Sequence, residues 1–372
     1  MFNFFFSLDI LKKLDQQSEL YKFLSELPNT NIIGVSRSIL NVRQEDNLYW
    51  LPRDKFQNFI TDHKGKNVYI GFKDYDLYNA VNSKTLLLVP DWINDQVGEK
   101  AKKYGIQIHT ENQLIKMLQI FININTMFYE LEVDEFATVY ALTNANSKQS
   151  NEIERQAIEK FRATLKEKNS TNLDAIKLIL SAGLSQKDEF MNTNIWAIMP
   201  SSGIQYNEEM MSIKEGIRYQ YKGLYDTIDH PLIIRNKIVA KSHFTSKNER
   251  LKKGAAKHLE SVYLNPFYKD KLKGKVVTIL DDYVTNGISF ESIRNLLIKA
   301  EVKHINFIAI GRFHSFDNGG KGIYQKEEYT ISGNIYNPGY EFNLVTATDI
   351  GKNGIYNNEA IKSIEAITEL LY

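Results

Sequence analysis

Two adjacent carboxylates, Asp281 and Asp282, follow an apolar, β-branched run that begins at Val276. A short turn over residues 285–287 comes directly after them, and a helical pattern opens near Ser289. In a parallel sheet the carboxyl ends of the strands face the ligand crevice, and backbone N–H groups at a turn and a helix N-terminus suit a phosphate. Carboxylates beside that phosphate suit sugar hydroxyls, and a Mg²⁺ that neutralises a second phosphate. The segment therefore indicates a binding site for a phosphorylated sugar.

A second polar loop lies upstream, after the apolar run 194–199. It contains Ser201, Ser202 and Gly203, and Asn207 follows as the expected first residue of a helix. Proline, serine and glycine also dominate ordinary turns, so a plain turn is the alternative interpretation. The position of this loop upstream of the acidic pair favours the binding role.

Residues 274–290 resemble, without a gap, the substrate-binding motif of the type I phosphoribosyltransferases. The resemblance implies that Asp281 and Asp282 are the catalytic carboxylates, which hold the ribose hydroxyls of 5-phosphoribosyl-1-pyrophosphate and a Mg²⁺. It also implies which residues hold the 5′-phosphate: Thr285, Asn286, Gly287, Ile288 and Ser289. The family usually carries Thr-Thr-Gly-Thr here, so Asn286 and Ile288 depart from its pattern, and Ile288 removes one hydroxyl contact. The alternative is a buried strand that ends in an acidic turn and an Asn-Gly loop.

The same resemblance assigns roles to two other segments. In the family, a loop after an early strand binds pyrophosphate through backbone amides, which here implies Ser201, Ser202 and Gly203. Cationic residues and a mobile loop then cover the leaving pyrophosphate. The candidates are Arg235 and Lys237 at a strand end, and His243, Arg250 and Lys252 in the stretch that follows. A solvated basic surface is an equally good interpretation of each of these cations. Arg312 and His314, after a later strand, are candidates for the acceptor side, but a structural charge is the favoured interpretation of Arg312.

Strand and helix patterns alternate along the whole chain, which predicts an α/β fold with mostly parallel sheets. Apolar runs at 31–35, 67–71, 85–90 and 107–109 predict strands in the first part, and residues 2–6 predict a buried strand or helix. The length of 372 residues favours two domains. We expect an α/β domain at 1–147, a linking helix at 148–170, and a phosphoribosyltransferase-like parallel sheet flanked by helices at 171–372.

An acidic turn at residues 71–76, which contains Asp74 and Asp76, follows one of the early strands. It resembles the late acidic motif of the haloacid-dehalogenase-like phosphatases, whose carboxylates bind Mg²⁺. Those enzymes also need an early Asp-x-Asp, but the strand at 32–38 has no aspartate, and Asp9 has no second aspartate two residues on. The first domain is therefore expected to be a degenerate dehalogenase-like domain without phosphatase activity. An unrelated α/β domain with a surface acidic turn is the alternative.

Composition excludes several classes of protein. The chain has no cysteine, which rules out disulfides, thiolate nucleophiles and zinc–cysteine sites. Its net charge of +1 gives no global basic surplus for nucleic acid or an anionic membrane. No apolar run approaches the roughly 20 residues of a membrane span. We expect a cytoplasmic protein with no membrane partner.

Two functions remain open at this point. One is a Mg²⁺-dependent phosphoribosyltransferase-type enzyme that acts on 5-phosphoribosyl-1-pyrophosphate or a nucleotide, with transfer or cleavage at ribose C1. The other is a non-catalytic nucleotide or sugar-phosphate sensor in a bacterial stress or anti-phage assembly. Chains that join these two domain types resemble accessory proteins of retron-type systems, which would add a protein assembly with nucleic acid as partner. Variable loops build acceptor pockets in this fold, so the sequence identifies no acceptor.

Overall fold

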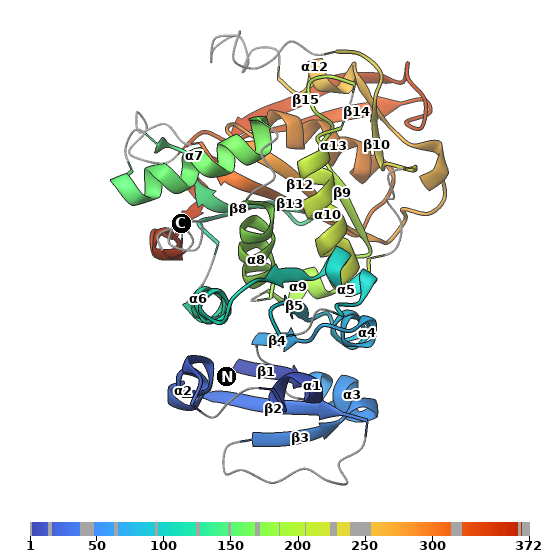
Figure 1. The fold of residues 1–372 in the computed structure, drawn as a ribbon. Coiled ribbons are helices and arrows are strands. Elements are labelled where there is room, and N and C mark those ends of the chain that lie inside the picture. Colours follow the sequence, from blue (N-terminus) through green and yellow to red (C-terminus); the bar gives the residue numbers. More distant parts are fainter. Residues whose placement is uncertain are drawn as a thin grey trace.

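The structure is a computed structural model of the chain. It describes residues 2–13, 17–37, 48–62, 66–93, 96–123, 127–147, 150–167, 172–185, 187–204, 206–223, 229–238, 254–313, 322–363 and 366. These residues form an α/β protein with a six-stranded parallel sheet flanked by helices and a six-stranded mixed sheet (Figure 1). No helix among them is long and apolar enough to span a membrane.

The parallel sheet is built from the first part of the chain and has the strand order β3-β2-β1-β4-β5-β6. Its strands are β1 (Phe2–Ser7), β2 (Thr30–Ser36), β3 (Leu48–Pro52), β4 (Lys66–Ile70), β5 (Leu86–Pro90) and β6 (Ile106–Ile108). The helices between them are α1 (Leu8–Leu11), α2 (Glu19–Glu26), α3 (Phe56–Asp62), α4 (Asp74–Asn82), α5 (Glu99–Tyr104) and α6 (Glu111–Asn123). Phe4, Phe5 and Phe6 are fully buried, as expected for a central strand that is covered on both faces. The four predicted strands are confirmed as β2, β4, β5 and β6, and residues 2–6 form a strand rather than a helix.

The mixed sheet has the order β16-β7-β8-β13-β12-β9. Its strands are β7 (Tyr129–Asp134), β8 (Ala137–Asn144), β9 (Ile195–Ile198), β12 (Val276–Val284), β13 (His304–Arg312) and β16 (Ile355–Tyr356). Strands β8, β13, β12 and β9 are parallel, whereas β7 and β16 are antiparallel to their neighbours. The apolar run that begins at Val276 is an interior strand, as its sequence predicts. The β7–β8 hairpin, which precedes residue 147, belongs to this mixed sheet.

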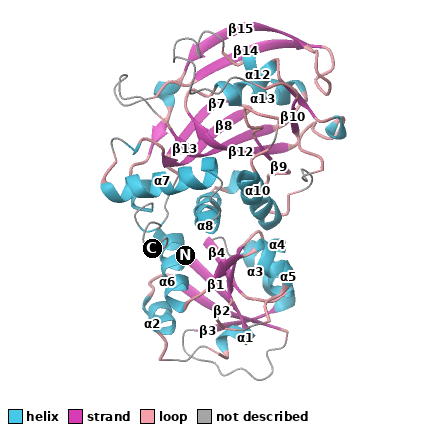
Figure 2. Cartoon of the chain, turned by 45° about the horizontal axis from the view of Figure 1, so that its top comes forward, coloured by secondary structure: helices cyan, strands magenta, loops and turns pink. Residues whose placement is uncertain are grey.

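Helices of the second part of the chain connect the two sheets. The helices of this part are α7 (Glu152–Glu167), α8 (Leu173–Leu184), α9 (Asp188–Met191), α10 (Glu208–Gln220), α12 (Ala256–Leu259) and α13 (Ile288–Lys299). One continuous apolar cluster joins Phe4 of β1, Leu178 of α8, Ile213 of α10 and Leu280 of β12. Figure 2 shows α8 and α10 in this position, between the parallel sheet and one face of the mixed sheet. The two sheets therefore share a core through these helices.

The opposite face of the mixed sheet is covered by α13 and by a two-stranded sheet. That sheet pairs β14 (Gln325–Ser332) with β15 (Glu341–Asp349), and a second antiparallel pair joins β10 (Ile233–Arg235) to β11 (Val262–Leu264). A second apolar cluster joins Phe290 and Ile293 of α13 to Phe307 of β13 and Ile331 of β14. Residues 322–324 lead directly into β14.

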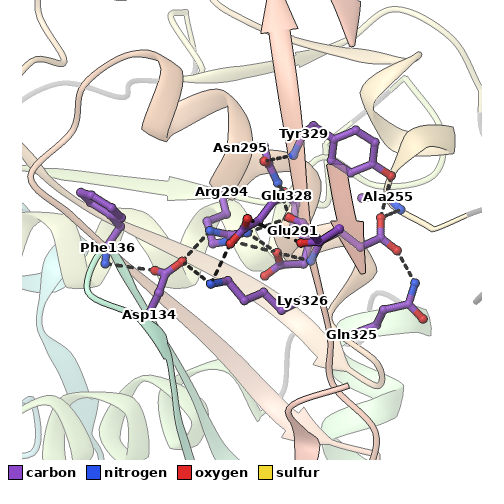
Figure 3. Close-up of polar contacts among 12 residues, drawn as sticks. Asp134, Phe136, Ala255, Glu291, Arg294, Asn295, Gln325, Lys326, Glu328 and Tyr329 are labelled. Carbon is purple, nitrogen blue, oxygen red and sulfur yellow. Dashed lines mark hydrogen bonds and ion pairs between the residues drawn. The ribbon is translucent and has the colours of Figure 1, made fainter. Parts of the chain in front are cut away.

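A buried polar network ties α13 to β14 and β7 (Figure 3). Arg294 donates through Nε to Glu291 at 2.8 Å, through Nη1 to Asp134 at 2.6 Å, and through Nη2 to the Glu327 carbonyl at 2.7 Å. Glu291 also accepts the Glu327 N–H at 3.0 Å and the Tyr324 hydroxyl at 3.0 Å. Arg294 and Glu291 are 2 % and 0 % exposed, so the network fixes the helix through fully desolvated groups.

Candidate functional site

Asp281 and Asp282 lie inside the C-terminal half of β12, not in the loop after it. The strand continues to Val284, and both carboxylates are partly buried. Leu280 and Val284 would share a face in a regular strand, yet they belong to the two different apolar clusters. The regular alternation of side chains between the two faces of the sheet is therefore interrupted between Leu280 and Val284. Asp281 and Asp282 lie in this interrupted part of the strand.

The two carboxylates accept hydrogen bonds from the backbone next to them and influence each other's charge. Asp281 Oδ1 accepts the N–H of Asp282 at 2.8 Å, and Asp282 Oδ1 accepts the N–H of Tyr283 at 2.7 Å. Burial raises the pKa of Asp281 well above its usual range, and the negative charge of Asp282 raises it further. The positive charge of Lys166 opposes this shift. The two carboxylates thus form a compact acidic centre, and a cation or a hydroxyl donor beside it would stabilise their ionised forms.

A lysine from α7 already contacts this centre. Lys166 Nζ donates to Asp282 Oδ2 in an ion pair and lies 5.6 Å from the centre of the Tyr283 ring. Sequence analysis did not identify Lys166, because it stands 116 residues before Asp282 and belongs to no motif. Residues 148–170 were predicted only as a linking helix. Nothing in their sequence indicates that Lys166 would contact Asp282.

The turn after β12 presents backbone N–H groups at the start of α13. Gly287 has a φ of +77° and caps the helix, so the first N–H groups of α13 have no intrahelical acceptor. The carbonyls of this turn are engaged: Arg312 Nη1 donates to that of Thr285, and the Gln325 N–H donates to that of Asn286 at 3.0 Å. Arg312 thereby has the structural role predicted for it. The N–H groups, in contrast, remain available to an anion.

Ile288 is buried, with 4 % of its surface exposed, so its side chain lies in the interior rather than toward a ligand. Ser289 is partly exposed and Thr285 is exposed. These two residues are the hydroxyl groups that remain near the turn. The 5′-phosphate contacts implied for this segment would therefore come from backbone N–H groups and from Thr285 and Ser289.

Gly287 allows a direct test of how closely this turn is packed. We expect Gly287→Ala to destabilise the protein more than Gly274→Ala, although both glycines have positive φ angles, +77° and +71°. The left-handed backbone costs an alanine about 1–2 kcal/mol at either position. A Cβ at residue 287 would also lie 2.3 Å from the Tyr324 ring, whereas nothing lies within 4 Å of one at residue 274. Urea unfolding of both variants measures the difference, and equal losses would contradict the close packing.

Arg235 ends β10 as a buried cation. It is 4 % exposed, and its Nη1 donates to Ser261 Oγ. Its Nε has no hydrogen-bond partner among the described residues. Burial lowers the pKa of Arg235 to about 10, and the negative charge of Asp281 opposes that shift. A buried guanidinium with a free donor near a carboxylate is well suited to an anionic ligand.

Lys237 lies two residues further on and is exposed. The structure therefore separates it from the buried Arg235, with which the sequence had grouped it. His243, Arg250, Lys252 and His314 lie outside the described residues.

The predicted loop with Ser201, Ser202 and Gly203 follows β9, which is the parallel neighbour of β12. Its carboxyl end therefore lies at the same sheet edge as the acidic pair. Ser201 Oγ approaches the Gly203 carbonyl at 3.5 Å, and a Cβ on Gly203 would meet only that hydroxyl, at 3.8 Å. Open space beside the loop leaves its backbone accessible. Asn207 caps α10 by accepting the Met210 N–H at 3.0 Å, which confirms the predicted helix start.

The acidic pair fits a Mg²⁺ only in part. Carboxylate oxygens are the ligands that Mg²⁺ prefers, often one or two together with substrate phosphates. Asp281 Oδ1 accepts the Asp282 N–H, and Asp282 Oδ2 holds the Lys166 ammonium. The described part of the chain contains no group of three or more His, Asp or Glu side chains that could hold a metal. A Mg²⁺ shared by both carboxylates would require Lys166 to leave Asp282.

The acidic turn of the first sheet has its carboxylates engaged in local structure. Asp76 is fully buried and accepts the N–H groups of Phe72 and Lys73 at 3.1 and 3.0 Å. Burial raises its pKa to about 6. Asp74 Oδ1 accepts two N–H groups at the start of α5, at 2.9 and 3.0 Å. Both carboxylates thus cap helices and stabilise the turn.

Comparison of the chain with known proteins gave no match: no protein-family model, no curated protein and no solved structure is similar to it. The chemistry of the site is therefore inferred from its own side chains. The structure gathers an acidic pair, a lysine, a buried arginine and two loops with accessible backbone at or near one edge of the mixed sheet.

Proposed function

We propose that the chain is a Mg²⁺-dependent phosphoribosyltransferase-type enzyme that acts on 5-phosphoribosyl-1-pyrophosphate or a nucleotide, with transfer or cleavage at ribose C1. One observation supports this most. The acidic pair lies close to the C-terminal end of an interior parallel strand, and a left-handed glycine and the N-terminus of α13 follow within a few residues. This order along the chain puts acceptors for sugar hydroxyls next to backbone N–H groups that suit a phosphate.

Each group of the site then has one role in binding. Asp281 and Asp282 accept hydrogen bonds from the ribose 2′- and 3′-hydroxyls, and the N–H groups of residues 286–289 bind the 5′-phosphate. Arg235 and the loop at 201–203 bind the pyrophosphate. Asp281, and Asp282 once Lys166 has left it, would hold Mg²⁺, which would neutralise charge on the diphosphate. These contacts fix the sugar by both of its charged ends.

The reaction needs no protein nucleophile. The bond between C1 and the pyrophosphate oxygen breaks, and pyrophosphate leaves with the electron pair. A nitrogen of the acceptor, or water, then forms the new bond to C1 and loses a proton to solvent. Positive charge develops on the ribose ring, so positioning and the negative charge of the acidic pair carry the catalysis.

We further propose that the two sheets correspond to two functional parts. The mixed sheet, with residues 171–372, forms the phosphoribosyltransferase-like domain, to which β7 and β8 contribute from before residue 147. The parallel sheet forms a degenerate dehalogenase-like domain, and α7 is the linking helix of 148–170. The helix caps made by Asp74 and Asp76 are consistent with a structural role for that acidic turn.

A second candidate function is favoured by Ile288. Its buried apolar side chain stands where a phosphoribosyltransferase usually has a hydroxyl, which would weaken phosphate contacts during turnover. The chain would then be a non-catalytic nucleotide or sugar-phosphate sensor in a bacterial stress or anti-phage, retron-like assembly that includes nucleic acid. A cytoplasmic location suits either function.

Pyrophosphate release separates the two functions. The purified chain is mixed with 5-phosphoribosyl-1-pyrophosphate, Mg²⁺ and a panel of purine and pyrimidine bases. An enzyme should release pyrophosphate with one of them, and the release should disappear when both Asp281 and Asp282 are replaced by asparagine. Binding by calorimetry without release would indicate the sensor, and neither binding nor release would reject both functions. Mass spectrometry of a co-purified nucleotide would identify the ligand.

A further inference from the structure

The C-terminal end of α7 contacts both segments that are proposed to bind the ligand. Lys166 Nζ donates to Asp282 of β12, and the carbonyl of Leu165 accepts a hydrogen bond from Asn207 Nδ2 at 2.6 Å. Asn207 closes the loop that contains residues 201–203. Figure 1 shows α7 lying along the mixed sheet, although Lys166 precedes Asp282 by 116 residues in the sequence. This helix is therefore part of the site and more than a link between sheets.

The charges on α7 are placed to act on this site. Lys166 has three N–H donors, of which one pairs with Asp282, and its side chain is 43 % exposed. Its other donors have no partner among the described residues and can reach an incoming ligand. Arg162, one turn earlier, brings a second positive charge close enough to oppose the rise in the pKa of Tyr283 that burial causes. The helix thus adds two positive charges close to the acidic pair and to Tyr283.

The Lys166 ammonium and a divalent cation would compete for Asp282. Two cations on one carboxylate repel each other, so a metal that uses both carboxylates has to displace the lysine. Without any cation, the adjacent negative charges of Asp281 and Asp282 would repel an anionic sugar phosphate. The free Nε of the buried Arg235 independently indicates an anion on the Asp281 side. The acidic pair needs a nearby positive charge to bind such a ligand. The Lys166 ammonium supplies that charge through its ion pair with Asp282.

We propose that Lys166 is a ligand-binding residue that acts as a built-in cation of this site. It neutralises Asp282 and offers its remaining donors to the anionic ligand when no metal is bound, and a divalent cation has to displace it. This proposal rests on the proposed function for the identity of the ligand. It predicts two opposite effects of removing the lysine: metal binds more tightly, and the ligand binds more weakly in the absence of metal.

The test compares the wild-type chain with Lys166→Gln, which keeps the length and polarity of the side chain but removes its charge. Arg155→Gln is the matched control, because Arg155 lies on the same helix and forms an exposed ion pair with Glu152, away from the site. Binding of Mn²⁺ alone is followed by electron paramagnetic resonance. Binding of 5-phosphoribosyl-1-pyrophosphate is followed by calorimetry, once in EDTA and once in Mg²⁺.

In Lys166→Gln we expect Mn²⁺ to bind about tenfold more tightly and the ligand in EDTA to bind about tenfold more weakly, with Mg²⁺ restoring most of the loss. The control should change neither value. Unchanged Mn²⁺ affinity, or unchanged or tighter ligand binding in EDTA, would overturn the proposal and make Lys166 a surface ion pair or a blocking residue. If the wild-type chain does not bind the ligand even in Mg²⁺, the proposed function fails, while the Mn²⁺ comparison still decides the role of Lys166.

Discussion

Replacing Asp281 and Asp282 together by asparagine should weaken the binding of 5-phosphoribosyl-1-pyrophosphate by about tenfold to a hundredfold. Hydrogen bonds to a charged group contribute roughly 1.5–3 kcal/mol each and are about twice as strong as neutral ones, so two amides in place of two carboxylates lose roughly 1.5–3 kcal/mol together. Asparagine keeps the shape of the side chain, so the change removes charge alone. The two single variants act on one ligand group, and their effects should not add. Calorimetric titration with ligand and Mg²⁺ measures all three variants.

The fold should survive this double substitution. Burial raises the pKa of Asp281, which means that the folded state disfavours its ionised form. A group of this kind destabilises the folded protein as pH rises through its raised pKa, so the amide should leave stability unchanged or higher at neutral pH. Circular dichroism and urea unfolding check this point. Glu301→Gln, at an exposed ion pair with Lys273 on the opposite end of the sheet, is the neutral control. Unchanged ligand affinity in the double variant would leave the acidic pair as a local turn feature and would reject the phosphoribosyl function.

Local patterns in the sequence predicted the elements that frame this site. The apolar run from Val276 predicted an interior strand, because only a strand covered on both faces avoids polar residues at alternate positions. Asn207 predicted the start of α10, because its side chain can accept an N–H group in the first turn. Both features depend on neighbours within a few residues, and a single sequence contains that information.

Contacts between distant segments were not predictable in the same way. Lys166 meets Asp282 because α7 lies across the mixed sheet, and nothing in the pattern of that helix specifies its partner. The hairpin of β7 and β8 joins β13 through parallel pairing over more than 160 residues, which local periodicity cannot detect. Strand β3 was also missed, since residues 48–52 carry no clear alternation. The position of the acidic pair was thus predictable from sequence, while the cation beside it was not.

Arg294→Met should destabilise the protein by about 3–5 kcal/mol, which is the usual cost of removing one partner of a buried ion pair. The change leaves the fully buried Glu291 carboxylate without its cation and the Glu327 carbonyl with one donor fewer (Figure 3). Methionine fills much of the same volume, so the loss is one of charge and hydrogen bonding. Urea unfolding, followed by circular dichroism, measures the free energy of unfolding. Lys326→Gln is the matched control, because Lys326 pairs with Asp134 at the more exposed rim of the same network and should cost less than about 1 kcal/mol.

The pH dependence of this loss identifies its cause. Burial raises the pKa of Glu291, and Arg294 opposes that rise, so removing the arginine should raise the pKa further. Between the unfolded-state pKa, about 4.3, and the raised value, the folded state of Arg294→Met keeps a proton that the unfolded state has lost. Stability of the variant should therefore fall as pH rises through this range, and its deficit should be smaller at pH 5 than at pH 8. Replacing Glu291 by leucine in the same chain removes the buried charge and should recover most of the loss, with no remaining pH dependence from this site. A deficit that is equal at both pH values, and that persists in the double variant, would instead indicate lost packing around the methionine.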